Sequence, residues 1–349
     1  MRKLKIGYAP YSQDLNHPAD RRRIVHWAKH RGHKITLDVS NSNDLNILTN
    51  RADFTGLIKK IPNVPVIFDM VDGYLGPEVL WKDWGRGFSK VITKQLSSSV
   101  KPYRQLIIET CQQASAVICS TVEQKETISP YNKNVHAILD FHEEFPLLPP
   151  SLKDKNRIES KLVWEGFPYT IKGLRLLENA FANLDKSMKI SLDVVTDLTY
   201  PKYLGAYAYR PTSTLLGDIP TILGKDLQII NWTIPNLVNS AKWASIAVLP
   251  LDPSGSLNSL KAENRLLIFW RLGIPVIASP SLSYRRVMKE AGIDGICFSE
   301  NDWEAKILDW ISNPITRFSA AQLGQSYLHE NHNEKLLFSS WDNLIESVL

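Results

Sequence analysis

The sequence predicts an α/β protein built from two Rossmann-like, doubly wound domains that face each other across a cleft. Two observations predict this architecture: short buried strands alternate with helices in both halves of the chain, and a proline-rich hinge separates the two series. The length agrees, because 349 residues exceed what a single hydrophobic core usually organises. A ligand is expected in the cleft between the domains.

Residues 1–145 form the first predicted domain. Its apolar runs predict strands, and the helical spacing of apolar residues between those runs predicts helices of about ten residues. The strands are expected at 5–9, 34–39, 64–70, 116–120 and 136–139, and the helices at 20–31, at 105–114 and from Thr121 onwards. Alternation of this kind is typical of parallel βαβ units.

A linker is expected at 146–158, where three prolines precede a cluster of charges. The alternation then restarts in a second domain, residues 159–328. Its strands are expected at 161–164, 190–195, 227–230, 246–249, 274–278 and 295–298, with a helix at 174–184. Residues 329–349 are expected to form a helix that crosses back to the first domain.

Composition restricts the possible classes of protein. With 44% hydrophobic and 22% charged residues the chain is expected to be globular, and its net charge of +5 permits an anionic partner without identifying one. Three scattered cysteines are too few for a disulfide framework or a zinc site, which favours the reducing cytoplasm. No run approaches the ~20 apolar residues of a membrane span, and the basic opening is interpreted as a first strand rather than a signal peptide.

Two common nucleotide-binding motifs are missing from the sequence. The dinucleotide fingerprint G-x-G-x-x-G opens neither domain, and the only G-x-G, at 85–87, follows no strand. The Walker pattern is also missing. A nicotinamide-dependent enzyme or a P-loop kinase therefore has no support from motifs.

Four segments together resemble the GT-B glycosyltransferases, most closely the retaining, family-4-type bacterial sugar transferases. ENRLLIFWRLGIPVIAS resembles the sugar-nucleotide helix, glycine turn and strand of that family. LVWEGFPYTIKGLRLLENAFANL resembles the strand, loop and lysine-glycine helix start that open its C-terminal domain, and NWTIPNLVNSAKWASIAVLPLD the helix and strand before its donor loop. ASAVICSTVEQKETI resembles the strand and helix near the end of its first domain.

The resemblance implies transfer of a hexose from a nucleotide-sugar donor to an acceptor hydroxyl, on a glycan or a lipid-linked glycan. It also implies retention of configuration, with no metal and no further cofactor. Two other functions stay open. One is a non-hydrolysing nucleotide-sugar epimerase on the same scaffold, and the other is a non-catalytic GT-B-like binding or partner protein.

The donor is expected on the second domain. Lys172 and Gly173 are expected at a helix N-terminus, where free N–H groups, the helix dipole and the lysine charge all favour a phosphate. A solvated surface lysine is the alternative. The other candidate donor-binding residues are Gly166, Ser254, Gly255, Ser256, Lys261, Asn264 and Arg265.

The sequence departs from the family pattern at two places. The donor helix of the family carries two glutamates eight positions apart, for the transferred sugar and for the nucleotide ribose, where this sequence has Leu260 and Ile268. The arginine that usually begins the second domain is replaced by Glu165 and Gly166. The departures imply that contacts to the donor are either rebuilt or lost.

The acceptor is expected on the first domain, in the loop and helix start after the first strand. The candidate acceptor-binding residues are Asp14, Asp20, Arg21 and Arg22. Three arginines at 21–23 are unfavourable at the positive end of a helix, and a phosphorylated or carboxylated acceptor explains them. In the alternative interpretation, Asp20 caps the helix and the arginines point to solvent.

Three residues are candidates for catalysis. His17 lies in the same loop, and its ordinary pKa of about 6.5 suits a base for the acceptor hydroxyl, although a loop histidine is more often structural. Asp69 and Asp72 follow a strand end and are expected either to contact acceptor hydroxyls or to cap the turn.

Residues 76–105 suggest a further partner. Six basic residues there are interleaved with Trp81, Trp84 and Phe88. Basic groups beside aromatic rings suit an anionic membrane surface, which would place the protein at the inner face of the membrane. A solvated helical face is the alternative. The basic stretch is too short to indicate a nucleic-acid partner.

Overall fold

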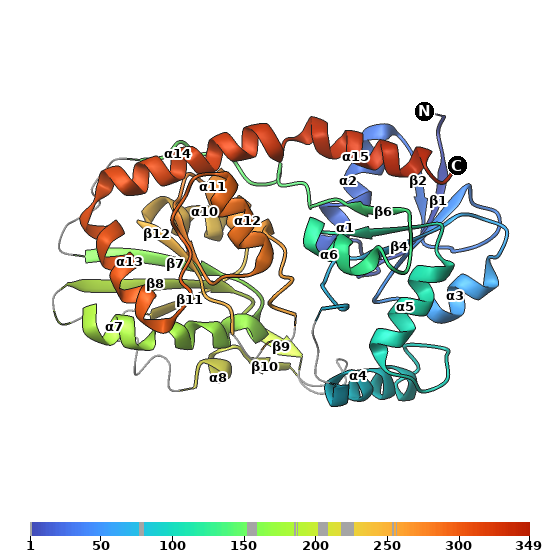
Figure 1. Cartoon of the computed structure of the whole chain (residues 1–349), viewed down its shortest axis with the longest axis horizontal. Coiled ribbons are helices and arrows are strands. Elements are labelled where there is room, and N and C mark those ends of the chain that lie inside the picture. Colours follow the sequence, from blue (N-terminus) through green and yellow to red (C-terminus); the bar gives the residue numbers. More distant parts are fainter. Residues whose placement is uncertain are drawn as a thin grey trace. The chain divides into compact units, whose positions relative to one another are not determined.

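The computed structural model describes residues 2–76, 80–151, 159–184, 186, 188–201, 209–217, 227–252, 255 and 257–349 (Figure 1). The chain forms two compact units. Unit 1 comprises Met1–His142, Ser259–Ala262 and Asn333–Leu349, and unit 2 comprises Glu143–Asn258 and Glu263–His332. Each unit contains a parallel sheet with helices, so the predicted α/β fold class is confirmed.

Unit 1 is built on a parallel sheet of six strands in the order β2-β1-β3-β4-β5-β6. The strands are β1 (Lys5–Ala9), β2 (Lys34–Thr36), β3 (Leu45–Thr49), β4 (Val66–Met70), β5 (Ala116–Cys119) and β6 (Val135–Ala137). Every residue of β3, β4 and β5 is buried, as is typical of a parallel sheet covered on both faces.

Helices cover both faces of this sheet and enclose a hydrophobic core on each. They are α1 (Pro18–Arg21), α2 (Ile24–Arg31), α3 (Phe54–Lys60), α4 (Leu80–Ile92), α5 (Tyr103–Gln113), α6 (Val122–Ile128) and α15 (Glu334–Glu346). Phe54 of α3 and Ile107 of α5 belong to one core. Trp27 of α2 and Trp341 of α15 belong to the other, so the C-terminal helix completes unit 1 (Figure 1).

Unit 2 contains a parallel sheet of five strands in the order β11-β8-β7-β12-β13. The strands are β7 (Glu159–Glu165), β8 (Lys189–Thr196), β11 (Leu227–Asn231), β12 (Ile246–Leu249) and β13 (Val276–Ala278), and a small antiparallel hairpin adds β9 (Thr199–Pro201) and β10 (Tyr209–Pro211). The strand expected at 295–298 is wrong: that segment makes only an isolated bridge between Ile296 and Ala278.

The helices of unit 2 are α7 (Glu178–Leu184), α8 (Ser213–Leu216), α10 (Ile234–Trp243), α11 (Asn264–Arg271), α12 (Leu282–Glu290), α13 (Glu300–Ser312) and α14 (Pro314–Asn331). Figure 1 shows α7 on one side of the sheet and α10 and α11 on the other. Gly273 makes the turn from α11 to β13 with a φ of +72°, and a Cβ there would lie 2.6 Å from the carbonyl oxygen of Leu148.

The segment after β7 corrects one expectation. The sequence predicts a loop there, with a helix that begins at Lys172 and Gly173. Instead, Pro168 starts a 3-10 helix, η1 (Pro168–Leu177), that continues directly into α7. Proline favours the first turn because its φ is already helical and its missing N–H needs no partner there. Lys172 therefore lies inside a helix rather than at its N-terminus.

Each parallel sheet has a switch point, where the strand order reverses. In unit 1, β1 leads to β2 on one side, while β3, β4, β5 and β6 follow on the other, so the switch point lies between β1 and β3. In unit 2 it lies between β7 and β12. Open α/β sheets bind ligands outside the carboxyl ends of the strands at such a point. The loops after β1, β3, β7 and β12 are therefore the places to examine.

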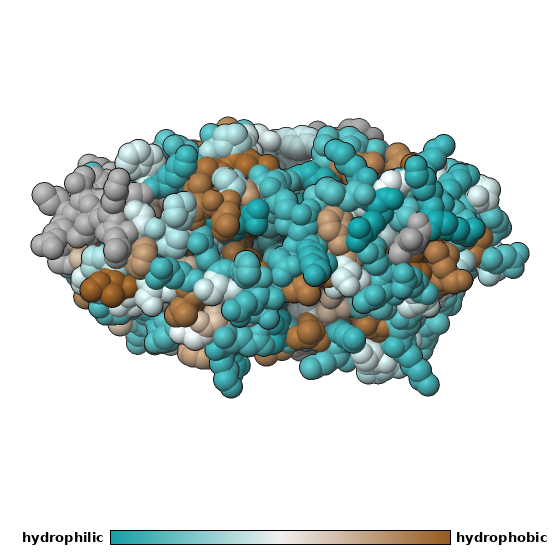
Figure 2. All heavy atoms as spheres, turned by 90° about the horizontal axis from the view of Figure 1, so that it is seen from above, coloured by the Kyte–Doolittle hydropathy of each residue, from teal (hydrophilic) through white to brown (hydrophobic). Residues whose placement is uncertain are grey.

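The surface in Figure 2 is mainly hydrophilic, with apolar residues in separate patches among polar ones. Single exposed apolar residues are ordinary on protein surfaces. Among the described residues, no helix is both long enough and apolar enough to cross a bilayer.

Candidate functional site

In unit 2 the segments on either side of the switch point are in direct contact. A Cβ on Gly173, in η1, would lie only 2.4 Å from the carbonyl oxygen of Pro250, which follows β12. Only glycine permits the two backbones to approach this closely. The helix after β7 and the loop after β12 therefore form one continuous wall beside the carboxyl ends of the two strands.

Arg265 joins the same two segments through its side chain. It lies in the first turn of α11, and its Nη1 donates a 2.8 Å hydrogen bond to the carbonyl oxygen of Glu165, the last residue of β7. A Cβ on Gly166 would lie 2.8 Å from this nitrogen, so glycine leaves room for the guanidinium. The half-buried guanidinium of Arg265 thus lies at the switch point, although the loop after β7 contains no arginine of its own.

Two acidic side chains near Arg265 are held by partners that the sequence did not reveal. Glu165 Oε1 accepts a 2.9 Å hydrogen bond from the indole of Trp232, which follows β11. Glu263, the N-cap residue of α11, is buried and forms an ion pair of 2.8 Å with Arg286 of α12. Trp232 and Arg286 lie far from these glutamates in the sequence, so only the fold brings them together.

The other predicted donor residues are distributed over both units. Lys172 is exposed, and Gly255 lies in a turn where its N–H donates to the carbonyl oxygen of Asp252 at 3.0 Å. Asn264 is the first residue of α11. Lys261 belongs to unit 1, where its Nζ lies 3.6 Å from a carboxylate oxygen of Asp72. Ser254 and Ser256 lie outside the described residues.

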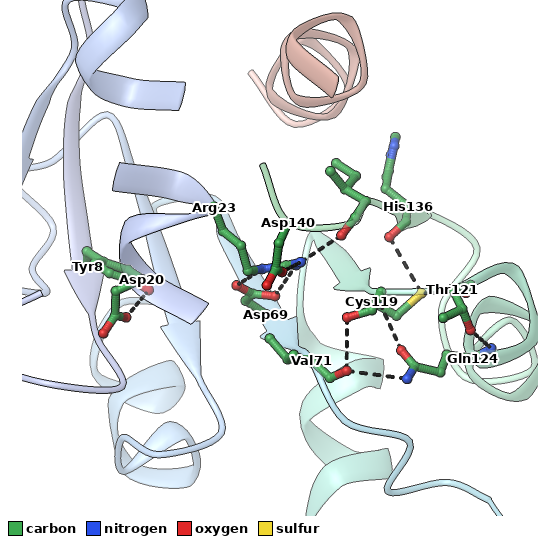
Figure 3. Close-up of polar contacts among 12 residues, drawn as sticks. Tyr8, Asp20, Arg23, Asp69, Val71, Cys119, Thr121, Gln124, His136 and Asp140 are labelled. Carbon is green, nitrogen blue, oxygen red and sulfur yellow. Dashed lines mark hydrogen bonds and ion pairs between the residues drawn. The ribbon is translucent and has the colours of Figure 1, made fainter. Parts of the chain in front are cut away.

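In unit 1, Asp20 holds the loop after β1 in place (Figure 3). It is completely buried, and its carboxylate accepts hydrogen bonds from the hydroxyl of Tyr8 at 2.5 Å and from the N–H groups of Tyr11 and Ser12 at 2.8 and 2.9 Å. Asp20 therefore binds the protein's own loop rather than presenting a carboxylate to an acceptor. This contact, and not a helix cap, is the reason for its burial.

His17 is the residue that caps α1. Its Nδ1 accepts a hydrogen bond of 3.2 Å from the N–H of Ala19, and its ring stacks on that of Tyr11 with centroids 5.1 Å apart. Burial lowers the pKa of His17, so the neutral ring is favoured near pH 7. Because Nδ1 accepts, the proton of the neutral ring sits on Nε2. His17 is therefore arranged to donate a hydrogen bond from Nε2, not to remove a proton there.

The three consecutive arginines have separate environments. Arg21 donates from Nη1 to the carbonyl oxygen of Asn16 at 2.6 Å, and Arg22 is buried, with 7% of its surface exposed. Arg23 is completely buried and lies 2.8 Å from Asp69 and 3.3 Å from Asp140 (Figure 3). The sequence predicted that an anionic acceptor binds the three arginines. For Arg23, the anions are instead the carboxylates of Asp69 and Asp140.

Asp69 and Asp72 differ in their exposure to solvent. Asp69 has no exposed surface and makes a two-pronged contact with Arg23, from Nε at 3.2 Å and from Nη2 at 2.8 Å. Burial alone lowers the pKa of Arg23, but the two carboxylates raise it above its ordinary value, so the guanidinium stays charged. Asp72 and Asp14 keep exposed carboxylates, with 40% of the Asp72 side chain accessible.

A basic cluster near the carboxyl end of the unit 1 sheet combines one arginine that the sequence analysis did not single out with two basic residues of the 76–105 segment. We define it as Arg51, which follows β3, together with Arg86 and Lys90 of α4. Lys90 Nζ lies 5.1 Å from the ring centroid of Tyr103, and the Arg86 guanidinium lies 5.5 Å from Tyr74 and 5.8 Å from Tyr103. Burial, and then repulsion by the two arginines, lowers the pKa of Lys90 to about 8.

Comparison with known proteins identifies the fold. No family model and no curated protein matches the sequence. HepE of Anabaena, solved in complex with UDP-glucose, is similar over 99% of this chain and 100% of its own, at 12% identity and a TM-score of 0.65. TarM is similar over 88% of this chain, at 13% identity and a TM-score of 0.62. A UDP-forming trehalose-phosphate synthase of Burkholderia xenovorans is similar over 88% of this chain and 74% of its own, at 12% identity and a TM-score of 0.60.

The chain has the GT-B fold. It spans about 55% of the length of TarM and the whole of HepE. The GT-B resemblance was carried mainly by the second half of the sequence, and the structural likeness extends it over unit 1 as well.

Leu260 and Ile268, the two residues that the sequence analysis aligned with the family glutamates, are both buried. Leu260 packs in unit 1, where a Cβ on Gly73 would lie 2.4 Å from its own Cβ and where its carbonyl oxygen accepts a 2.9 Å hydrogen bond from Gln124. Ile268 lies on the buried face of α11. Neither side chain has a polar atom that could contact a sugar or a ribose.

Proposed function

We propose that this protein transfers a hexose from a nucleoside-diphosphate sugar to an acceptor hydroxyl. The observation that carries the proposal is the unit 2 switch point, where Arg265 of α11 reaches the end of β7 at Glu165 and Gly166. This is the loop that lacks the family's arginine. Arg265 of α11 brings a positive charge to the end of β7. This arrangement supports the interpretation that contacts to the donor are rebuilt rather than lost.

A diphosphate fits the charges available at this point. Arg265 supplies a guanidinium that can bind two phosphate oxygens, and the exposed Lys172 supplies a second, mobile charge from η1. When the sugar–phosphate bond breaks, negative charge develops on the leaving diphosphate, and fixed cations stabilise it. These groups supply charge that a metal ion supplies elsewhere, which supports the proposal of metal-independent transfer. The full-length likeness to HepE with bound UDP-glucose supports a nucleoside diphosphate as the leaving group.

The acceptor is assigned to unit 1, where the available groups differ from those expected from the sequence. Asp72 is the one predicted catalytic carboxylate with an exposed side chain, and Lys261, a predicted donor residue, lies beside it at 3.6 Å. We assign Asp72 to the acceptor hydroxyl and His17 to a hydrogen bond donated from Nε2. Asp69 and Asp20 act by holding Arg23 and the loop after β1, so they position the site without contacting substrate. Retention of configuration rests on the family resemblance.

The basic cluster suits an acceptor that carries phosphate or carboxylate groups. Burial, Arg51 and Arg86 all lower the pKa of Lys90, so Lys90 lies close enough to both arginines to be repelled by them. Neither Arg51 nor Lys90 forms an ion pair with a carboxylate of the described residues. An anion bound beside Lys90 relieves the repulsion, and the ring of Tyr103 lies 5.1 Å from Lys90 and 5.8 Å from Arg86. We therefore assign the binding of an anionic acceptor to this cluster rather than to Arg21 and Arg22.

Sulfate provides a test of the anion site, because its charge does not change between pH 6 and 10. Lys90 is charged below its pKa of about 8 and neutral above it. Calorimetric affinity for sulfate is therefore expected to fall as the pH rises from 7 to 9. In Lys90→Met the affinity is expected to be lower at pH 7 and to lose this pH dependence. The same pH dependence in the variant contradicts the assignment.

Helix α4 carries an apolar stripe that suits a membrane surface. Trp84, Phe88 and Ile92 are spaced by four residues, so they share one face of the helix, and they are 49%, 53% and 61% exposed. Basic residues on the same helix suit anionic headgroups. We propose that α4 binds an anionic membrane surface peripherally, which favours a lipid-linked acceptor.

Phe88→Glu is expected to weaken binding to phosphatidylserine vesicles about tenfold or more, because an exposed aromatic side chain contributes up to about 2 kcal/mol when it enters an interface. Leu323→Glu, on an exposed position of α14, is the matched control and is expected to bind like the wild type. Vesicle co-sedimentation measures both. Equal binding by Phe88→Glu and the wild type would contradict the proposal that α4 binds a membrane.

Turnover separates the three candidate functions. The protein is incubated with UDP-, GDP-, ADP- and TDP-glucose, with and without a bacterial lipid extract as acceptor source, and the nucleoside diphosphate and sugar products are measured by mass spectrometry. We expect one donor to release its diphosphate only when the extract is present. A change in the sugar without an acceptor indicates the epimerase, and no conversion of any donor favours the non-catalytic protein.

A further inference from the structure

Two histidines of α2 and one glutamate of α15 bring three metal-ligating atoms together on unit 1. His26 and His30 are one helical turn apart, so their rings lie on the same face of α2. His26 Nε2 lies 3.3 Å and His30 Nε2 lies 3.9 Å from Oε1 of Glu334. One ligating atom of each residue lies within 4.8 Å of the others. None of the three belongs to the donor or acceptor site.

Two of these three separations are close to those around a tetrahedral ion, and the third, between the two imidazole nitrogens, is within 4.8 Å. Ligand atoms that each lie about 2.0–2.2 Å from a zinc ion are about 3.3–3.6 Å from one another. The distances from Glu334 Oε1 to the two imidazole nitrogens, 3.3 and 3.9 Å, require shifts of only a few tenths of an ångström to reach this geometry. The His30 and Glu334 side chains are 48% and 42% exposed, so an ion reaches them from solvent and side-chain adjustment is inexpensive.

The hydrogen bond of His30 to the backbone is a second observation that supports a metal ligand. Its Nδ1 lies 3.2 Å from the carbonyl oxygen of His26, and a carbonyl oxygen only accepts, so Nδ1 carries a proton. In the neutral ring, Nε2 is then unprotonated and turns its lone pair towards the Glu334 carboxylate. Metal-bound histidines commonly donate their other ring N–H to a backbone carbonyl in this way. A cation is required between this nitrogen and the carboxylate, and a metal ion supplies it as a proton does.

We propose that His26, His30 and Glu334 bind a divalent transition-metal ion, of which Zn²⁺ is the best match. Two imidazole nitrogens and one carboxylate oxygen suit zinc and its neighbours rather than calcium or magnesium, which prefer oxygen ligands. Water occupies the fourth tetrahedral position. The ion links α2 to the first turn of α15, the helix that completes one core of unit 1 through Trp341. Its role is to fasten the C-terminal helix.

Surrounding groups favour an ordered site. The His26 ring lies 4.4 Å from that of Phe141 and 5.8 Å from that of Phe338, and the His30 ring lies 5.0 Å from Phe338, so the imidazoles are held by aromatic neighbours. The cysteines do not compete for the ion. All three are buried, and burial raises the pKa of each thiol to about 12.

Calorimetry on the full chain, stripped with EDTA and titrated with zinc chloride, tests the proposal. We expect one Zn²⁺ per chain. The affinity is expected to fall at least about tenfold in His30→Gln and in Glu334→Gln, because each removes one of three protein ligands. His329→Gln, which removes an exposed histidine from α14, is the matched control and is expected to bind like the wild type.

A second measurement guards against effects on folding. At about a hundredfold excess of Zn²⁺ over the wild-type Kd, the midpoint of thermal unfolding is expected to rise by roughly 5 °C or more in the wild type and by about half as much or less in His30→Gln. Without metal, His30→Gln is expected to unfold like the wild type, since the ring is half exposed. The site does not exist if the wild type shows no saturable binding. It is also excluded if His30→Gln keeps the wild-type affinity, or if His329→Gln weakens binding equally.

Discussion

Replacement of Arg23 by methionine is expected to destabilise unit 1 by about 3–5 kcal/mol, because it leaves Asp69 buried without its counter-ion. Arg23 and Asp69 both have no exposed surface, and the pair joins the residue before α2 to β4, with Asp140 as a second acceptor. Hydrogen exchange of the α2 and β4 peptides, followed by mass spectrometry, measures this loss as the free energy of opening. Peptides of unit 2 serve as the internal reference.

Two further variants separate lost charge pairing from lost packing. Arg23→Met combined with Asp69→Leu removes both charges, so it is expected to be more stable than Arg23→Met alone. Arg21→Met removes a partly exposed arginine of the same run and is expected to change stability by less than about 0.5 kcal/mol. If Arg23→Met is no more destabilising than Arg21→Met, the internal ion pair is not what holds this arginine.

Gly173→Ala is expected to lower affinity for a nucleoside diphosphate by about tenfold or more. The new Cβ would lie 2.4 Å from the backbone oxygen of Pro250, so either η1 or the loop after β12 must move. Overpacking of this kind typically costs about 1–3 kcal/mol, and the displaced wall is the proposed diphosphate site. Calorimetry with the preferred nucleotide measures the loss, and thermal unfolding verifies that the variant is folded.

The matched control is Gly85→Ala. A Cβ on Gly85 meets no atom within 4 Å, and the residue lies inside α4, where alanine is favoured over glycine by about 1 kcal/mol. Nucleotide affinity is therefore expected to be unchanged and stability equal or higher. If both glycine variants bind the nucleotide equally well, the contact between η1 and the Pro250 loop does not shape the site.

Much of the fold was predictable because hydrophobic patterns act locally. Strands such as β1, β4 and β8 are short segments rich in apolar residues, and the sequence located them within a few residues. Strand β3 was missed because Asn46 and Thr49 interrupt its apolar pattern. Both are completely buried, and the Asn46 amide is satisfied by the backbone of Ser40, a contact that exists only in the folded chain.

The site was harder to predict because its contacts join residues far apart in the chain. The three arginines at 21–23 were read as one basic patch, but Arg23 turns inward to Asp69, 46 positions later. Arg51 was overlooked because it follows the missed strand β3. Arg265 was identified from the sequence as a phosphate ligand, but its reach to Glu165, 100 positions earlier, required the structure. Long-range pairing of this kind leaves no pattern in a single sequence.

The central claim, that unit 2 holds a nucleotide-sugar donor at the switch point between β7 and β12, is tested most directly by calorimetric binding of UDP, GDP, ADP and TDP to the full chain. The account predicts that one nucleotide binds clearly better than the others. It also predicts that Lys172→Ala and Arg265→Met each weaken this binding about tenfold or more, in line with the loss of a charge-assisted phosphate contact. Failure of all four nucleotides to bind, or wild-type affinity in both variants, would contradict it.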